Sequence, residues 1–364
     1  PILAAARVRR PPRQRVPSCG VSRGRGCSVM SRSHDEQLQL ELPGAEGERS
    51  ALDHRVRPAM QLAPVTPPAA TRQKALGAFY TPMPMAQKMV EWAVRSPDDR
   101  ALDPSFGGLV FLRAAHARLM QLGASPDEAS ERLYGCDLDD DAHASAIAQE
   151  GLGLPETALL HRDFFTATPD ADLPRADAVV GNPPYVRYQL HNGAGASGRR
   201  VAAAAGLNMT RLASSWAPFV LHSTEFVARG GRLALVLPAE LMHAQYAGQV
   251  LSWVQRRFAR TALVVFEQRV FPGALEEVVL LFAEGRGEGT SSSVGLVECE
   301  SLSDFRLETL TDKLAAPPAR RPGRGKLLAQ LLPEAVRELY ERLSDDDRVS
   351  TLGAAASVDI GAVT

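Results

Sequence analysis

From Lys74 onward, short apolar and β-branched runs alternate with longer segments whose apolar positions recur at helical spacing. This alternation is typical of parallel strands joined by helices. The runs predict seven strands, at residues 100–102, 133–136, 158–161, 178–180, 232–237, 262–266 and 278–282. The longer segments predict helices at residues 85–94, 110–122, 140–150, 210–228, 245–258 and 333–343. The sequence therefore predicts an α/β fold with a mostly parallel seven-stranded sheet.

The last two predicted strands are separated only by a turn-rich segment, residues 268–276, which leaves no room for a helix. Strands joined in this way pair antiparallel, so we expect a terminal hairpin at the edge of the sheet. After Glu284 the pattern loosens into a Gly/Ser-rich connector at 285–293, a basic stretch at 320–326 and one helix. We therefore expect the folded unit to occupy residues 74–284.

The chain before this unit has a different character. Residues 1–32 contain eight arginines, no acidic residue and no hydrophobic periodicity, which predicts disorder. Two interpretations stay open: a translation from an upstream frame with the true start at Met30, or a basic arm that binds nucleic acid. Residues 33–70 are rich in proline and typical of a linker. Residues 1–73 are therefore expected to form a disordered basic and proline-rich tail with a linker.

Composition narrows the class of protein. The chain has 45% hydrophobic and 23% charged residues and a formal net charge of -1, which excludes disorder throughout. No apolar run approaches the roughly 20 residues of a membrane helix and no signal peptide is recognisable, so we expect a cytoplasmic protein without membrane contact. The four cysteines lack the spacing of a zinc site or a disulfide framework, and no metal is expected. Any affinity for nucleic acid must come from a local basic surface.

The strongest chemical signal is Asn182-Pro183-Pro184-Tyr185, which follows the apolar strand 178–180 and Gly181. Open α/β sheets keep their active sites at the carboxyl ends of strands. An Asn-Pro pair by itself is a common turn opener. Here, however, two prolines fix the backbone, so that the Asn182 amide oxygen and the Pro183 carbonyl are presented together beside an aromatic ring.

Such an arrangement suits an amine conjugated to an aromatic ring or a carbonyl group, which is a poor nucleophile because its lone pair is delocalised. Two acceptors that grip its two N–H groups would draw the nitrogen toward tetrahedral geometry, while Tyr185 stacks on the ring. The predicted catalytic residues are therefore Asn182, Pro183, Pro184 and Tyr185.

In this setting the NPPY block resembles motif IV of the S-adenosylmethionine-dependent amino-methyltransferases, and its surroundings resemble the N6-adenine DNA methyltransferases of the γ arrangement. Further blocks follow that family's order between residues 74 and 284. They are Gly77-Ala78-Phe79-Tyr80-Thr81-Pro82 (motif X), Leu102-Asp103-Pro104-Ser105-Phe106-Gly107-Gly108-Leu109-Val110-Phe111-Leu112 (motif I), Tyr134-Gly135-Cys136-Asp137-Leu138-Asp139 (motif II) and Arg162-Asp163-Phe164-Phe165 (motif III).

The resemblance implies a doubly wound, Rossmann-like class I methyltransferase fold over residues 74–284, with S-adenosyl-L-methionine as cofactor. Asp103 would hold the methionine ammonium, and Asp137 would accept the ribose hydroxyls. Leu109 replaces the third glycine usual in motif I, which is expected to narrow the methionine pocket. The other implied cofactor-binding residues are Phe79, Tyr80, Thr81, Pro104, Gly107, Gly108, Asp163 and Phe164, with Asp163 on the adenine amino group and Phe164 or Phe165 against the base.

The implied substrate is double-stranded DNA with a flipped adenine. Tyr185, Arg187 and Tyr188 are the expected substrate-binding residues, and the basic segment 192–200 is either a clamp on the DNA or a solvated loop. The implied activity is site-specific DNA methylation, in restriction-modification or another phage defence, with partners from such a system.

Three alternatives stay open. NPPY also serves enzymes that methylate a glutamine amide in translation release factors, although those usually lack a block like Phe79 to Pro82. RNA guanine methyltransferases are a second alternative, and a non-catalytic DNA-binding scaffold with the same fold is a third.

Residues 285–364 are expected to hold a linker, a helix and the start of a target-recognition region whose body is absent. A single DNA-reading module already buries about 600–1,000 Å² of protein surface, and residues 285–364 are too few to supply such a surface. We therefore expect the chain to hold DNA only weakly, through contacts with phosphates.

Overall fold

The computed structural model describes residues 81–148, 152–185, 195–207, 214–244, 246–270, 277–316, 334–344, 346 and 348–350. Contacts divide the chain into two units, Pro1–Pro64 and Val65–Thr364, and every described residue belongs to the second. None of the helices within the described ranges is both long and apolar enough to cross a lipid bilayer.

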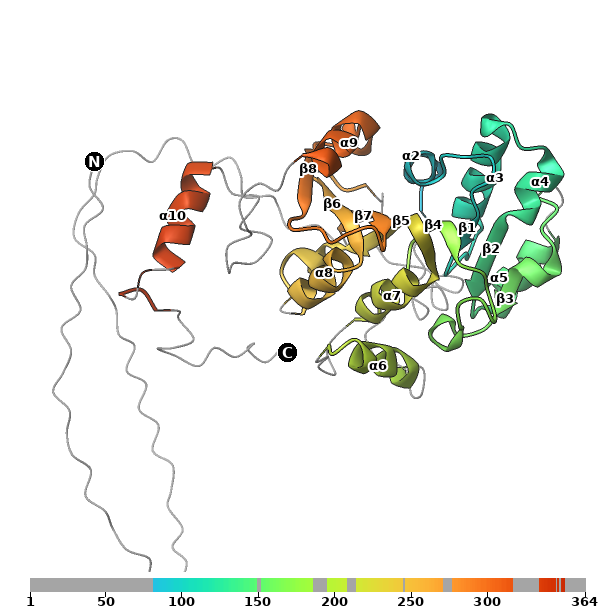
Figure 1. Cartoon of the computed structure of the whole chain (residues 1–364), viewed down its shortest axis with the longest axis horizontal. Helices are drawn as coiled ribbons and strands as arrows, with labels where there is room; N and C mark the ends of the chain where they lie inside the picture. Colours follow the sequence, from blue (N-terminus) through green and yellow to red (C-terminus); the bar gives the residue numbers. More distant parts are fainter. Residues whose placement is uncertain are drawn as a thin grey trace, which may run out of the picture. The chain divides into compact units, whose positions relative to one another are not determined.

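Eight strands form one sheet in the order β3-β2-β1-β4-β5-β7-β6-β8 (Figure 1). β7 runs antiparallel to both of its neighbours, β5 and β6, and all other pairs are parallel. The strands are β1 (Ala101–Asp103), β2 (Leu133–Asp137), β3 (Leu159–His161), β4 (Ala176–Gly181), β5 (Val227–Pro238), β6 (Phe258–Phe266), β7 (Val278–Arg286) and β8 (Gly295–Cys299). The predicted α/β class with a mostly parallel sheet and an antiparallel β6–β7 hairpin is confirmed.

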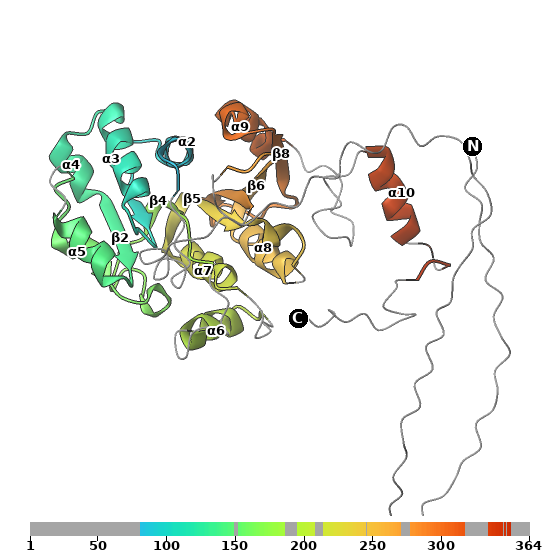
Figure 2. The same ribbon diagram turned by 180° about the vertical axis from the view of Figure 1, so that it is seen from behind.

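Helices pack against both faces of the sheet, as the two views in Figures 1 and 2 show. Alternate side chains of β5 explain this, because Ala234 and Val236 join a core with α2, α3 and α9, whereas Leu233 and Leu235 join a core with α7 and α8. The helices are α2 (Met83–Ala93), α3 (Val110–Leu122), α4 (Pro126–Glu131), α5 (Asp140–Ala148), α6 (Gly195–Ala204), α7 (Trp216–Ser223), α8 (Ala247–Gln255), α9 (Leu307–Ala315) and α10 (Glu334–Ser344). Five 3-10 turns complete the described elements: η1 (Glu156–Ala158), η2 (Phe164–Thr166), η4 (Thr224–Phe226), η5 (Ala239–Met242) and η6 (Leu302–Asp304).

The predicted number of strands and the predicted end of the folded unit need correction. All seven predicted strands are present, but β8 pairs in parallel with β6 and becomes the edge strand, so the hairpin does not lie at the edge. After β8, Phe305, Leu310 and Leu314 are buried in the core. The fold therefore continues past Glu284. The short strand β8 and the helix after it, in which two leucines are buried, complete this end of the sheet.

Two local predictions need comment. The described part of the segment 192–200 belongs to α6, whose Ala202 is buried in the core, so the solvated-loop interpretation was wrong, whereas the clamp on DNA stays a prediction. The long helix expected over 210–228 is, in its described part, the eight-residue α7 followed by η4, and β5 begins at Val227. Residues 208–213 lie outside the described residues.

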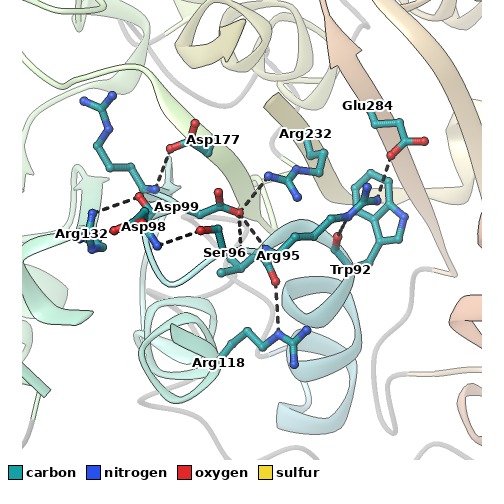
Figure 3. Close-up of polar contacts among 12 residues, drawn as sticks. Trp92, Arg95, Ser96, Asp98, Asp99, Arg118, Arg132, Asp177, Arg232 and Glu284 are labelled. Atoms are coloured by element: carbon teal, nitrogen blue, oxygen red, sulfur yellow. Dashed lines mark hydrogen bonds and ion pairs between the residues drawn. The ribbon is translucent and has the colours of Figure 1, made fainter. Parts of the chain in front are cut away.

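A network of charged side chains fixes the start of the fold at the amino ends of the parallel strands (Figure 3). The carboxylate of Asp99 accepts hydrogen bonds from the backbone N–H of Arg95, just after α2, over 2.8 Å and from Arg232 of β5 over 2.9 Å. Glu284 of β7 accepts from Arg95 over 2.9 Å and from Arg260 over 2.7 Å. Asp99 and Arg232 are both about nine-tenths buried, and removing one partner of such a pair would leave an uncompensated charge. The network thereby anchors α2, whose first turn follows Thr81.

Candidate active site

Four neighbouring parallel strands bring most of the predicted site residues to one edge of the sheet. Asp103 ends β1, Asp137 ends β2, and Asn182 directly follows β4. Asp163 comes two residues after β3. Because β3, β2, β1 and β4 are adjacent and parallel, these residues share the carboxyl edge, opposite the charged network.

Asp103 is a buried carboxyl group with an unused acceptor. Its side chain is 1% exposed, and Oδ1 accepts a hydrogen bond from the backbone N–H of Ser105 over 3.0 Å. Oδ2 is buried and has no partner among the described residues. Burial raises the pKa of Asp103 to about 8, against a weaker lowering effect of the Ser105 N–H. A buried oxygen of this kind fits a cationic group of a ligand.

Asp137 ties the glycine turn to the second strand. Its Oδ2 accepts from the backbone N–H of Gly107 over 2.8 Å, and its Oδ1 accepts from the backbone N–H of Asp139 over 2.9 Å. Burial raises the pKa of Asp137 above its usual range. Gly107 has a φ of 43°, and an added Cβ would meet only the Ser105 carbonyl, at 3.9 Å. The turn, which continues through the exposed Gly108, therefore leaves room for a group close to its backbone.

Leu109, which was expected to narrow the methionine pocket, is a core residue. Its side chain is 1% exposed and lies in the hydrophobic core that contains α2 and α3. Its φ of 62° is in the left-handed region that favours glycine. Leucine at this position thus adds core packing in exchange for local backbone strain, while the turn itself stays open.

The structure separates the roles of the two aromatic residues after β3. Phe164 is buried, with the rings of His222, Phe226 and Phe219 4.8, 4.9 and 5.1 Å away between centroids. Its ring is therefore part of the core, and its assignment to the cofactor stays a prediction. Phe165 is only half-buried, while Asp163 caps η2 by accepting from the Phe165 N–H over 3.1 Å.

The loop Asn182–Tyr185 is held at both ends. The Asn182 carbonyl accepts from the Ser105 hydroxyl over 3.2 Å, and the Pro184 carbonyl accepts from the Ser215 hydroxyl. Between them, the Pro183 carbonyl has no hydrogen-bond donor among the described residues. One acceptor of the loop thus stays available while its neighbours are fixed.

Hydrogen bonds to Thr81 and Tyr185 orient the Asn182 side chain. Its Nδ2 donates to the Thr81 hydroxyl over 3.1 Å, and its Oδ1 accepts from the Tyr185 hydroxyl over 2.6 Å. In this arrangement the amide nitrogen faces Thr81 and the amide oxygen faces Tyr185. Sequence reasoning placed Thr81 at the cofactor and missed this contact, as it missed Ser105 and Ser215. Phe79, Tyr80, Arg187 and Tyr188 lie outside the described residues.

Gly181→Ala is expected to weaken binding of S-adenosylmethionine about tenfold, which corresponds to about 1.4 kcal/mol. An added Cβ would lie 2.8 Å from Asp103 Oδ1 and 3.2 Å from Pro104 Cδ, so the motif I turn would have to shift. Calorimetric titration checks this. Gly248→Ala is the matched control, because nothing lies within 4 Å of its Cβ, and it should bind like the parent. If Gly181→Ala bound S-adenosylmethionine as tightly as the parent, Asp103 would not be part of the ligand site.

Taken together, the described residues fit the cofactor that the motifs imply. The unpartnered Asp103 Oδ2 suits the methionine ammonium, and the open backbone at Gly107 suits a close approach. Asp137 ends the next strand at the same edge, and its carboxylate oxygens have further lone pairs with which a ribose can be bound. A group bound there would be next to the Asn182 loop.

Comparisons with known proteins agree with this geometry. A family model described as N-6 DNA Methylase matches residues 66–300. The chain is 27% identical over 275 residues to the type II methyltransferase M.PaeR7I of Pseudomonas aeruginosa, covering 67% of this chain and 46% of that protein. It is 21% identical over 239 residues to the type II methyltransferase M.AccI of Acinetobacter calcoaceticus, covering 64% and 41%. The chain thus spans less than half the length of either relative.

The fold also has solved counterparts. A putative class I S-adenosylmethionine-dependent methyltransferase from Listeria monocytogenes aligns with a TM-score of 0.50 at 14% identity, over 65% of this chain and 71% of that one. At this identity the similarity concerns the fold alone.

Proposed function

Since the chain belongs to the N-6 DNA methylase family, we propose that it transfers the methyl group of S-adenosylmethionine to the N6 amino group of an adenine in double-stranded DNA. The observation that carries the proposal is the Asn182–Tyr185 loop, in which the Pro183 carbonyl has no donor among the described residues while both flanking carbonyls are held. Together with Asn182 Oδ1 it supplies two acceptors for two N–H groups.

The two acceptors orient the target amine. The exocyclic nitrogen of adenine shares its lone pair with the ring, and hydrogen bonds to both of its N–H groups favour the tetrahedral geometry in which the lone pair is available. In the structure the Thr81 hydroxyl accepts from the NH2 group of Asn182, which leaves the amide oxygen for the target amine. The nitrogen needs no general base before it attacks, because its proton becomes acidic only afterwards.

The cofactor site lies on the neighbouring strands. When bound, S-adenosylmethionine supplies an electrophilic methyl group. Asp103 would hold its ammonium, Asp137 its ribose hydroxyls and Asp163 its adenine amino group, with Phe165 in place of the buried Phe164 beside the base. Thr81, Pro104, Gly107 and Gly108 line the same edge, and Phe79 and Tyr80 precede Thr81 in the motif. The order of motif X, motif I and NPPY along the chain supports the γ arrangement.

The target adenine must leave the duplex to reach this loop, because one of its two N6 hydrogens is otherwise used in the base pair and the base is stacked in the helix. The half-buried ring of Tyr185 can replace part of the lost stacking, which is worth roughly 1–3 kcal/mol per base. Its hydroxyl now occupies Asn182 Oδ1, so an incoming amine would displace or share this contact. Arg187 and Tyr188 follow directly and are proposed to contact the same strand.

A role in restriction-modification or another phage defence is the corresponding biological proposal. It is supported by type II methyltransferases among the relatives. The family match favours DNA over a glutamine amide or an RNA guanine as substrate.

The test is expression of the gene in a host that lacks adenine methyltransferases, followed by digestion of its DNA to nucleosides and mass spectrometry. N6-methyladenine should appear with the parent chain and be absent with Asn182→Ala. Methylated cytosine in place of adenine would show the wrong target base. Label from tritiated S-adenosylmethionine in RNA or in a release factor, but not in DNA, would favour the alternatives.

A further inference from the structure

The hydroxyl that holds the Pro184 carbonyl comes from a buried turn at the start of α7. Ser215 is the N-cap residue of this helix and is 5% exposed, and its neighbour Ser214 is 4% exposed. Because the Ser215 hydroxyl fixes one end of the loop Asn182–Tyr185, whatever fixes Ser215 also places the Pro183 carbonyl.

Both chain neighbours of Ser215 are tied to one carboxylate, that of Glu240. The Trp216 indole Nε1 donates to Glu240 Oε2 over 3.3 Å. On the other side, the Tyr246 hydroxyl accepts from the backbone N–H of Ser214 over 3.3 Å and donates to Glu240 Oε1 over 2.9 Å. The rings of Trp216 and Tyr246 lie 5.4 Å apart between centroids.

Glu240 lies in η5, directly after β5, and β5 pairs with the strand that carries the loop. Its carboxylate receives two donors on two oxygens. Glutamine offers only one oxygen, so one of the two contacts would be lost or would have to be remade with the Tyr246 hydroxyl as acceptor. Trp216 is fully buried, so its N–H cannot turn to water instead.

We propose that Glu240 is a positioning residue for methyl transfer, which holds Ser215 through Trp216 and Tyr246 and thereby places the Pro183 carbonyl for the target amine. This inference rests on the proposed function. Glu240 touches neither the substrate nor the cofactor. Its effect should therefore be seen in the rate of the reaction and not in the binding of S-adenosylmethionine.

The test compares Glu240→Gln and Tyr246→Phe with the parent and with Glu267→Gln. Glu267 is an exposed glutamate directly after β6, and this variant serves as the matched control. Methyl transfer from tritiated S-adenosylmethionine to DNA should fall about tenfold to a hundredfold in kcat for Glu240→Gln, since small misplacements of reacting groups have effects of this size. The dissociation constant for S-adenosylmethionine should stay within twofold. Tyr246→Phe keeps the ring and breaks only the hydroxyl link, so it should show a smaller loss in the same direction.

Amide hydrogen exchange of the peptide that contains Asn182 and Tyr185 gives a readout independent of DNA. Exchange should be faster in Glu240→Gln and Tyr246→Phe and unchanged in Glu267→Gln. Unchanged exchange and kcat in Glu240→Gln, with a parent that methylates DNA, would overturn the positioning role and leave the proposed function intact. If exchange were faster in Glu240→Gln but the parent never methylated DNA, Glu240 would still position the loop and the proposed function would be wrong. If Glu240→Gln does not fold, Tyr246→Phe decides by the same two measurements.

Discussion

Asn182→Ala is expected to lower the rate of methyl transfer to DNA by about 10²–10³, the usual effect of removing one preorganised polar contact to the reacting group. The dissociation constant for S-adenosylmethionine should not change, because Asn182 contacts Thr81 and Tyr185 and would meet the amine only as the reacting geometry forms. Single-turnover transfer from tritiated S-adenosylmethionine, paired with calorimetry, measures both quantities.

Tyr185→Phe is the matched control for this prediction. It removes the hydroxyl that donates to Asn182 Oδ1 but keeps the ring that would stack on the base. We expect its rate to stay within a few-fold of the parent, since the amine takes over the acceptor that the hydroxyl leaves. If Asn182→Ala methylated DNA at more than a tenth of the parent rate, groups other than Asn182 would hold the target amine.

The carboxyl edge of the sheet was predictable because a strand end can be recognised from its apolar run. Asp103, Asp137 and Asn182 each follow such a run, and parallel neighbours bring these positions together without any knowledge of packing. The contact between Thr81 and Asn182 was not predictable in this way. It joins residues 101 positions apart, and only the packing of α2 on the sheet brings them together.

Other differences between the expected and the observed structure arise where the sequence pattern is weak. Phe164 and Phe165 are equivalent by composition, and only the turn of η2 decides which ring is buried. β8 has five residues after a Gly/Ser segment, so its pairing with β6 leaves little periodicity to detect. In α9, by contrast, Leu307, Leu310 and Leu314 follow helical spacing, and this signal was available in the sequence.

Binding of S-adenosylmethionine is expected to strengthen with pH between about 6 and 7.5, roughly tenfold per unit, and Asp103→Asn should abolish this dependence. In the free protein, burial raises the pKa of Asp103 to about 8, so the carboxyl group is mostly protonated at pH 6 and must ionise before it can pair with an ammonium. The ligand's own amino group, with an ordinary pKa of about 7.7–8.0, stays mostly protonated over this range.

The Asp103 carboxyl group is also expected to make the free protein less stable as pH rises. The pH dependence of Tm is therefore an independent measurement of its raised pKa. A carboxyl with a raised folded-state pKa holds its proton more tightly when folded than when unfolded, so the stability it contributes at low pH is lost progressively from about pH 4 to about pH 8. A cation bound at Oδ2 would reverse this loss. The rise in Tm caused by saturating S-adenosylmethionine should therefore be larger at pH 8 than at pH 6 in the parent chain.

Asp103→Asn keeps the acceptor for the Ser105 N–H but places an NH2 group where Oδ2 is unpartnered. Its affinity for S-adenosylmethionine should be about 10- to 100-fold lower than the parent's at pH 7.5, because a hydrogen bond to a charged group is worth about 1.5–3 kcal/mol. Both its affinity and its ligand-induced Tm shift should be nearly constant with pH. If the variant kept the parent's pH dependence, another group would control ionisation at this edge, and Asp137, whose pKa burial also raises, would be the next to replace.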